Sequence, residues 1–296
     1  MQSPGLSDHP HRQPSLHERG VSLELVISSG TVTCLAISAA LCVALPFIIW
    51  IYMWGRVRFS QAIFGFLFSC AVVLLENLLD STFLAENGYL MANPLPYAVY
   101  LALSLAVLQS LGLFGGCLCI RSKYDSADAA VGLAVGFAVM ELFVAALSNV
   151  MSYALALYCN SNGVEAMAAA VEADNLQNML DQLQVIADTP ATTYLLSGFN
   201  RVAYTIQIVS LSVLAWFAAK DFSRLWTLAA AIVLQAIVRL PYGLYTAGVF
   251  TNFIQEEVIT YLLTAVLAAA AALIYNRFEP KTYKFKAERL RARRRR

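Results

Sequence analysis

Long apolar stretches dominate the chain, and short polar segments separate them. Seven of these stretches approach or exceed the roughly 20 residues with which an α-helix crosses a hydrocarbon core of about 30 Å. They cover residues 25–54, 60–84, 98–120, 129–157, 194–218, 225–249 and 258–275. Because lipid offers the backbone no hydrogen-bond partners, each stretch is predicted to be helical. The pattern therefore predicts an all-α, polytopic membrane protein with seven transmembrane helices.

The charges between the spans alternate from one side of the predicted bundle to the other. Lys and Arg occupy the loops after the first, third and fifth spans and the segment after the last span. The three remaining loops contain no Lys or Arg and carry acidic residues such as Glu86, Asp181 and Glu256. Since basic loops stay in the cytoplasm, this alternation predicts that the N-terminus is outside and the C-terminus inside.

Two polar tails flank a predicted transmembrane domain at residues 23–276. Residues 1–22 are polar and contain proline, which is typical of a disordered tail. Residues 277–296 form a basic cytoplasmic tail. It is predicted to contact anionic lipid headgroups, where each basic residue contributes about 1 kcal/mol. The lipid bilayer is thus the first predicted partner.

The external loop at residues 158–193 is predicted to contain a helix. Apolar residues recur in it at helical spacing, with acidic residues between them. Such a helix could cap the bundle or lie on the outer membrane surface, and its acidity favours the cap. The stripe consists of Leu176, Met179, Leu180 and Leu183.

The amino-acid composition fits a membrane protein and limits which side chains could act in catalysis or metal binding. Hydrophobic residues make up 59% of the chain and charged residues 13%, whereas soluble domains carry about 25% charged residues. The basic tail follows a hydrophobic bundle, so nucleic-acid binding is not predicted. The three histidines, His9, His11 and His17, all lie in the N-terminal tail. A mechanism that needs a histidine base or histidine metal ligand within the membrane is therefore disfavoured, and neither a metal nor a cofactor is predicted.

Several ionisable or amide side chains fall inside the predicted spans. A charge in lipid is costly, so each one needs a partner or a water-filled cavity. The helical rise places the acidic and the basic groups at similar heights in the outer half of the membrane. We expect Glu141 to pair with Arg201 or Arg239. The ion pairs either hold the helices in register, which we favour, or form a ligand or ion site open to the outside. The predicted network consists of Glu76, Asp80, Glu141, Asn200, Arg201 and Arg239.

The order of residues from the third to the sixth span resembles the YhfC family of intramembrane metalloproteases, which are distantly similar to the CAAX-protease and bacteriocin-processing group. That family's pattern is similar to E-E-x-G-R, then G-x-G-H-G-x-x-E, then E-R, then A-I-x-x-H-x-x-x-D-x-P. Here Gly112, Gly136, Glu141, Arg201 and Pro241 fit the pattern. The seven-span layout with the N-terminus outside is compatible with this resemblance, and the predicted location is a bacterial cytoplasmic membrane.

The residues that would carry catalysis in this family are replaced. The paired glutamates correspond to Gln109 and Ser110, and the arginine after them to Leu113. The family's three histidines and its aspartate correspond to Phe137, Gln207, Gln235 and Arg239. A metalloprotease uses a glutamate to activate water and imidazole or carboxylate ligands to hold the metal. The resemblance therefore implies the fold without the catalysis.

Three functions remain open at this point. The first is a non-catalytic membrane protein whose polar interior binds a transmembrane helix or holds a partner protein. The second is an active intramembrane peptidase that uses Glu76, Asp80 and Glu141 instead of the replaced residues. The third is a transporter or small-ligand receptor, although we see no inverted repeat and no matched pair of broken helices. We favour the first, because the scaffold is retained while the site residues are lost.

Overall fold

A computed structural model describes residues 25–52, 57–84, 86–170 and 173–294 of the chain. Within these ranges the protein is helical and contains no strand, as predicted. The principal helices are α1 (Ser29–Tyr52), α2 (Phe59–Leu79), α3 (Gly88–Ala92), α4 (Pro94–Ile120), α5 (Asp128–Ala170), α6 (Ala173–Asp188), α7 (Ala191–Lys220), α8 (Trp226–Thr246) and α9 (Phe253–Arg294). The predicted tail at residues 1–22 lies outside the described residues.

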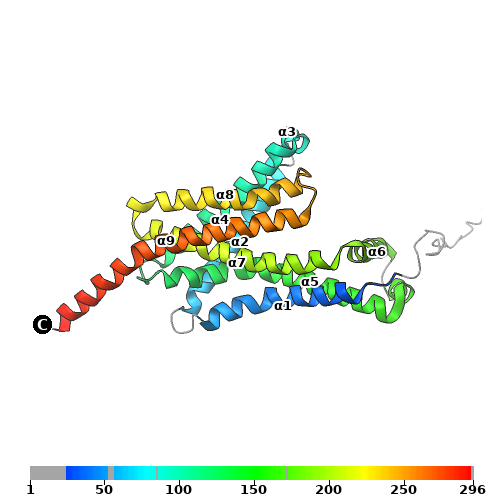
Figure 1. Ribbon diagram of the computed structural model, residues 1–296, viewed down its shortest axis with the longest axis horizontal. Helices are drawn as coiled ribbons and strands as arrows, with labels where there is room; N and C mark the ends of the chain where they lie inside the picture. The colour runs from blue at the N-terminus through cyan, green and yellow to red at the C-terminus, as the bar shows by residue number, and fades with distance from the viewer. Residues whose placement is uncertain (1–24, 53–56, 85, 171–172, 295–296) are drawn as a thin grey trace, which may run out of the picture.

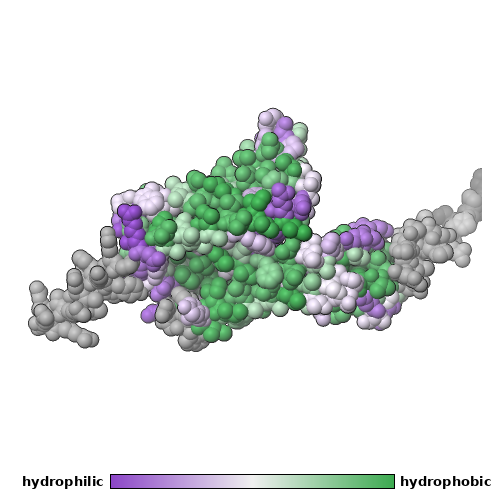
Figure 2. Space-filling view, in the orientation of Figure 1, coloured by the Kyte–Doolittle hydropathy of each residue, from purple (hydrophilic) through white to green (hydrophobic). Residues whose placement is uncertain are grey.

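Seven of the helices in the described ranges are long and apolar enough to cross a membrane, which confirms the predicted number of spans. They are α1, α2 with the π-helical turn Asp80–Leu84, α4, α5, α7, α8 and α9. Figure 2 shows apolar residues over the middle of the bundle and hydrophilic residues toward its two ends. The first described residues and the C-terminus lie at opposite ends of the bundle (Figure 1), as an odd number of spans requires.

Two helices extend beyond their predicted spans. α5 continues past residue 157 to Ala170 and bends at Gly163, whose φ of 79° is a left-handed conformation that glycine adopts readily. α9 begins before the predicted residue 258 and continues as one helix to Arg294. Its final turns are rich in Ala, Leu, Glu, Lys and Arg, which are good helix formers. The basic segment therefore prolongs the last transmembrane helix (Figure 1).

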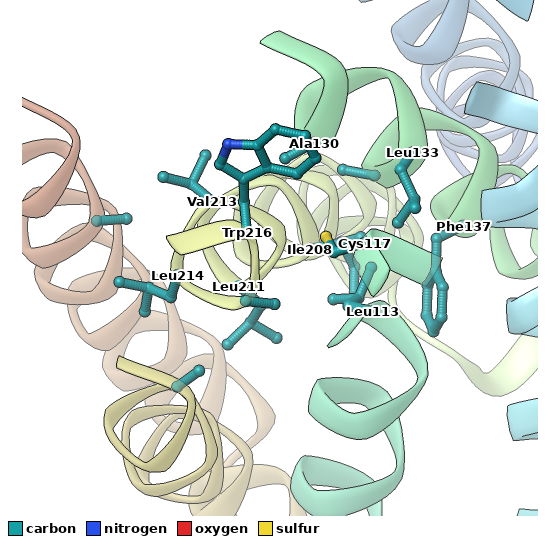
Figure 3. Packing of buried hydrophobic residues seen from close by; sticks show 14 of the residues in the cluster. Leu113, Cys117, Ala130, Leu133, Phe137, Ile208, Leu211, Val213, Leu214 and Trp216 are labelled. Carbon is teal, nitrogen blue, oxygen red and sulfur yellow. The ribbon is translucent and has the colours of Figure 1, made fainter. Parts of the chain in front are cut away.

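α7 is the central helix of the bundle. It packs against α1, α4, α5, α8 and α9, and 83% of its most apolar window is buried. Leu211, Leu214 and Trp216 of α7 are fully buried. They share one apolar core with Leu113 of α4 and with Phe137 of α5 (Figure 3). Because α7 has neighbours on nearly every side, its polar residues must find partners inside the protein rather than in solvent.

The predicted external helix is α6, and its apolar stripe packs against the end of the bundle. Leu180 and Leu183 are buried in a second apolar cluster with Ile27 and Leu35 near the start of α1 and with Ala156 of α5. Leu176 and Met179 lie partly buried against this cluster. These contacts are those of a cap and differ from those of a helix whose apolar face meets lipid.

Small residues bring α2 and α5 into backbone contact. A Cβ atom added at Gly136 would overlap the carbonyl oxygen of Ala62, and one added at Gly65 would overlap that of Leu133. Close approach at small residues is a common way for helices to associate in lipid, where no hydrophobic effect draws them together. The two glycines therefore fix the position of α2 on α5.

We predict that Gly136→Ala lowers the melting temperature of the purified protein in detergent. The new methyl group meets backbone rather than a flexible side chain, and such overpacking costs about 1–3 kcal/mol. Gly30→Ala is the matched control, because a Cβ at Gly30 makes only ordinary contacts at 3.7 and 3.9 Å. Equal melting temperatures for the two variants would contradict the close contact of α2 and α5.

Candidate functional site

Polar side chains in the bundle form two groups at different depths. The first, which we call the amide layer, consists of Gln109 on α4, Gln207 on α7 and Gln235 on α8. The second lies nearer the α6 end and contains the predicted network residues; we call it the charged cluster. Arg239 follows Gln235 by four residues and Glu141 follows Phe137 by four, so the two groups are about 6 Å apart along these helices.

The three glutamines of the amide layer are almost completely buried. Gln235 Nε2 donates a hydrogen bond to Gln109 Oε1 at 2.9 Å. Gln207 Nε2 donates to Thr264 Oγ1 of α9 at 2.8 Å. Gln207 Oε1, Gln235 Oε1 and the hydroxyl of the neighbouring Ser110 have no hydrogen-bond partner among the described residues. Gln109 and Gln235 thus bond to each other, whereas Gln207 bonds to Thr264 of α9 instead.

Two further positions of the resemblance, Phe137 and Leu113, belong to the apolar core. Phe137 is buried and lies against Gly112, where an added Cβ would come within 3.2 Å of its ring. Leu113 is fully buried in the same core (Figure 3). An aromatic ring and an aliphatic side chain therefore fill volume at positions where the resemblance implies a ligand and an arginine.

An ion pair between α5 and α7 forms the middle of the charged cluster. Arg201 Nη1 donates to Glu141 Oε1 at 2.8 Å, and each side chain is about one-third exposed, at 31% and 35%. This is one of the two pairings expected from the sequence. The adjacent Asn200 Nδ2 donates to Glu257 Oε1 of α9 at 2.8 Å. Consecutive residues of α7 thus connect α5 with α9.

Arg239 of α8 completes the cluster without a salt bridge among the described residues. Its guanidinium lies 5.2 Å from the ring centroid of Tyr204, which is a cation–π distance. Its Nε and Nη2 atoms are shielded from solvent and have no hydrogen-bond partner in the described structure. The charges of Glu76 and Glu256 interact with it. Arg239 is therefore held by a ring and by surrounding negative charge.

The acidic residues of α2 lie at the edge of the cluster. Asp80 begins the π-helical turn and accepts a hydrogen bond from the Tyr100 hydroxyl of α4 at 3.2 Å. Glu76 lies four residues earlier and is partly exposed. It is close enough to Arg239 for attraction, and close enough to Asp80 and Glu141 for repulsion between like charges. Arg239 is therefore the group in the cluster that offsets the charge of Glu76.

Glu256 and Glu257 correct one interpretation of the sequence. The charge pattern predicts an external loop at Glu256 and the adjacent Glu257, but α9 begins at Phe253 and buries these two residues to 2% and 1% exposure. Glu257, Tyr261 and Thr264 have the helical spacing i, i+4, i+7, and each makes a hydrogen bond to α7. The same spacing is present in the sequence, but the continuous apolar stretch that predicts the span begins only after the two acids, at Val258.

The spans and their buried amides and charges define a polytopic helical membrane protein with a polar interior. The model of the YhfC intramembrane metalloprotease family matches residues 41–260, from α1 into α9, and the chain belongs to this family. The chain is also 25% identical over 250 residues to the "Uncharacterized membrane protein YhfC" of Bacillus subtilis (strain 168), covering 81% of this chain and 95% of that protein. No solved structure matches the chain.

The residues at the positions where the resemblance implies metal ligands do not suit a catalytic metal. Zinc is bound by thiolate, imidazole or carboxylate groups. The amide layer offers neutral glutamine oxygens, and Phe137 offers no ligand atom. The Gln109 oxygen is already occupied by Gln235. Among the described residues, no three His, Cys, Asp or Glu side chains are arranged to hold a metal ion.

We predict that reversing the charge at position 141 destabilises the bundle. Glu141→Lys places a cation beside Arg201, and loss of a charged hydrogen bond at a partly buried site costs about 1–3 kcal/mol. The double variant Glu141→Arg with Arg201→Glu should recover most of the loss in melting temperature. Glu86→Lys is the control, because Glu86 is exposed. If Glu141→Lys melts like wild type, the ion pair contributes nothing to stability.

Proposed function

We propose that this protein is a non-catalytic member of its family that binds a transmembrane helix of a partner protein. The observation that carries the non-catalytic part is the hydrogen bond between Gln235 and Gln109, together with the packing of Phe137 in the core. These contacts use the family's catalytic positions to join helices. A fold can retain a polar interior in this way after its metal ligands are lost.

The charged cluster supports the same conclusion. An alternative peptidase built on Glu76, Asp80 and Glu141 would need these carboxylates for a metal or an acid dyad. Glu141 instead forms an ion pair with Arg201, and Asp80 accepts a hydrogen bond from Tyr100. Both contacts compete with such chemistry.

The lipid-facing side of α2 supports the binding of a helix. Leu74 and Leu78 are 70% and 57% exposed, and the polar Asn77 between them is also exposed. An amide that faces lipid is unfavourable, and a neighbouring helix commonly covers it by hydrogen bonding. Glu76 adds negative charge at the same level. A partner helix with a Lys or Arg side chain at this depth would complement the surface.

We further propose that the C-terminus is cytoplasmic and that the final turns of α9 contact anionic lipid headgroups. Basic side chains of separate loops gather at the end of the bundle where α9 leaves it. Arg224 lies 4.2 Å from the ring centroid of Phe278 of α9. Lys220 Nζ donates to the carbonyl oxygen of Arg121. Grouped basic loops favour retention on the cytoplasmic side.

Metal analysis tests the non-catalytic part. After purification, incubation with zinc and exhaustive dialysis, we expect far less than one zinc ion per chain by inductively coupled plasma mass spectrometry. The measurement is repeated on Glu141→Gln to detect metal held by the charged cluster. Stoichiometric zinc in wild type would contradict the proposal. Its loss in Glu141→Gln would then assign the metal to the charged cluster.

Helix binding is tested with a defined peptide in liposomes. A fluorescently labelled leucine-rich transmembrane helix with one lysine is compared with the same helix lacking the lysine. We expect the lysine peptide to bind wild type about tenfold more tightly. Glu76→Gln should remove the difference, whereas the exposed control Glu86→Gln should keep it. Equal binding of the two peptides to wild type would contradict the proposed surface.

A further inference from the structure

An apolar pocket lies at one side of the bundle, away from the polar interior. Its walls come from α1, α2 and α5, and its volume is about 330 Å³. The lining includes Cys42, Phe47 and Trp50 of α1, Phe59 of α2, and Val139 and Phe143 of α5. The residues of the amide layer and the charged cluster do not contribute to it. The pocket thus has no assigned role in the proposed function.

The packing of the helices explains why this space exists. α1 and α2 both pack along α5, but in the described structure they are not among the helix pairs that pack extensively on each other. The glycine contacts at Gly65 and Gly136 fix α2 on α5. Near the ends of α1 and α2, Trp50 and Phe59 meet edge to face with centroids 6.1 Å apart. The pocket is therefore a wedge with α5 as its floor and an aromatic pair at one end.

The side of this wedge faces the hydrocarbon region. Phe47 and Phe143 both line the pocket and are both 64% exposed at its rim. An engineered apolar cavity of roughly 150 Å³ stays dry and takes up benzene. A larger apolar pocket that opens toward lipid is therefore expected to hold hydrocarbon rather than water.

The end of the pocket near Phe59 carries a cation and hydroxyl groups. The side chain of Arg58 is exposed, and its guanidinium lies 5.8 Å from the ring centroid of Tyr124. The Tyr124 hydroxyl is hydrogen-bonded to the Ser60 hydroxyl at 2.9 Å. Arginine and hydroxyl donors suit a phosphate group. Arg58 and Ser60 flank the lining residue Phe59 in the chain, so these donors lie beside the pocket. An apolar slot with such donors beside it matches an amphiphile with an anionic head and a hydrocarbon chain.

From this combination we infer that the pocket binds one acyl chain of an anionic phospholipid, with the phosphate near Arg58. A transmembrane helix is about 10–12 Å wide with its side chains, which is too broad for this space, whereas an acyl chain is narrow enough. Lipid tails are as apolar as the pocket, so the hydrophobic effect does not favour entry. Binding instead comes from dispersion contacts with the pocket walls and from the attraction between phosphate and guanidinium.

Native mass spectrometry of the detergent-solubilised full chain tests this inference. After reconstitution with equal phosphatidylglycerol and phosphatidylcholine and gentle re-extraction, we expect one retained phospholipid per chain, mainly phosphatidylglycerol. Val139→Trp fills the pocket and should lower retention about tenfold. Val266→Trp is the matched control, because Val266 is 57% exposed on α9 and outside the pocket.

Arg58→Gln tests the contribution of the phospholipid headgroup separately from that of its acyl chain. We expect it to abolish the preference for phosphatidylglycerol while a neutral lipid is still retained. If Val139→Trp does not fold, Val43→Trp at the rim replaces it, because Val43 lines the pocket and is 50% exposed. The inference is overturned if wild type retains no lipid, or if the pocket variant retains as much as Val266→Trp. It is also overturned if wild type shows no headgroup preference. None of these results depends on metal content or on binding of a partner helix.

Discussion

Lipid supplies no hydrogen bonds, and this constraint organises the structure around α7. α7 is surrounded by five helices and carries Asn200, Arg201 and Gln207, each of which bonds to a neighbouring helix. A buried polar group without a partner costs about 1–3 kcal/mol, so these bonds also determine which helices lie next to α7. The polar interior is thus part of the packing of the bundle.

The buried amides of the interior join helices. Gln235 donates a hydrogen bond to Gln109, and Gln207 donates one to Thr264. Phe137, where the resemblance implies a histidine, is part of the apolar core. Nearer the α6 end, however, carboxyl groups on α2, α5 and α9 outnumber Arg201 and Arg239. Among them, Glu76 is next to the exposed Asn77, on the face of α2 where we propose that a partner helix binds.

Two surfaces with different chemistry therefore meet the lipid. The α2 face around Asn77 offers a polar group next to negative charge and suits a helix. The wedge between α1 and α2 has apolar walls and includes Phe59, the residue after Arg58, and we infer that it holds a lipid chain. The glycine-mediated contact of α2 with α5 positions both surfaces, because α2 forms one wall of the wedge and carries Asn77 on its exposed side.

Hydropathy alone determined the number of spans, the helical class and the inclusion of Glu141 and Arg201 in the membrane. These follow from local properties, because a backbone in lipid has to be helical and a buried charge needs a partner. The resemblance to the family also came from the linear order of residues. Only the tertiary structure decided that Arg201 rather than Arg239 pairs with Glu141, that Glu256 and Glu257 are buried, and that α1 and α2 leave a wedge on α5. These features depend on how helices rotate and approach one another, which hydropathy does not encode.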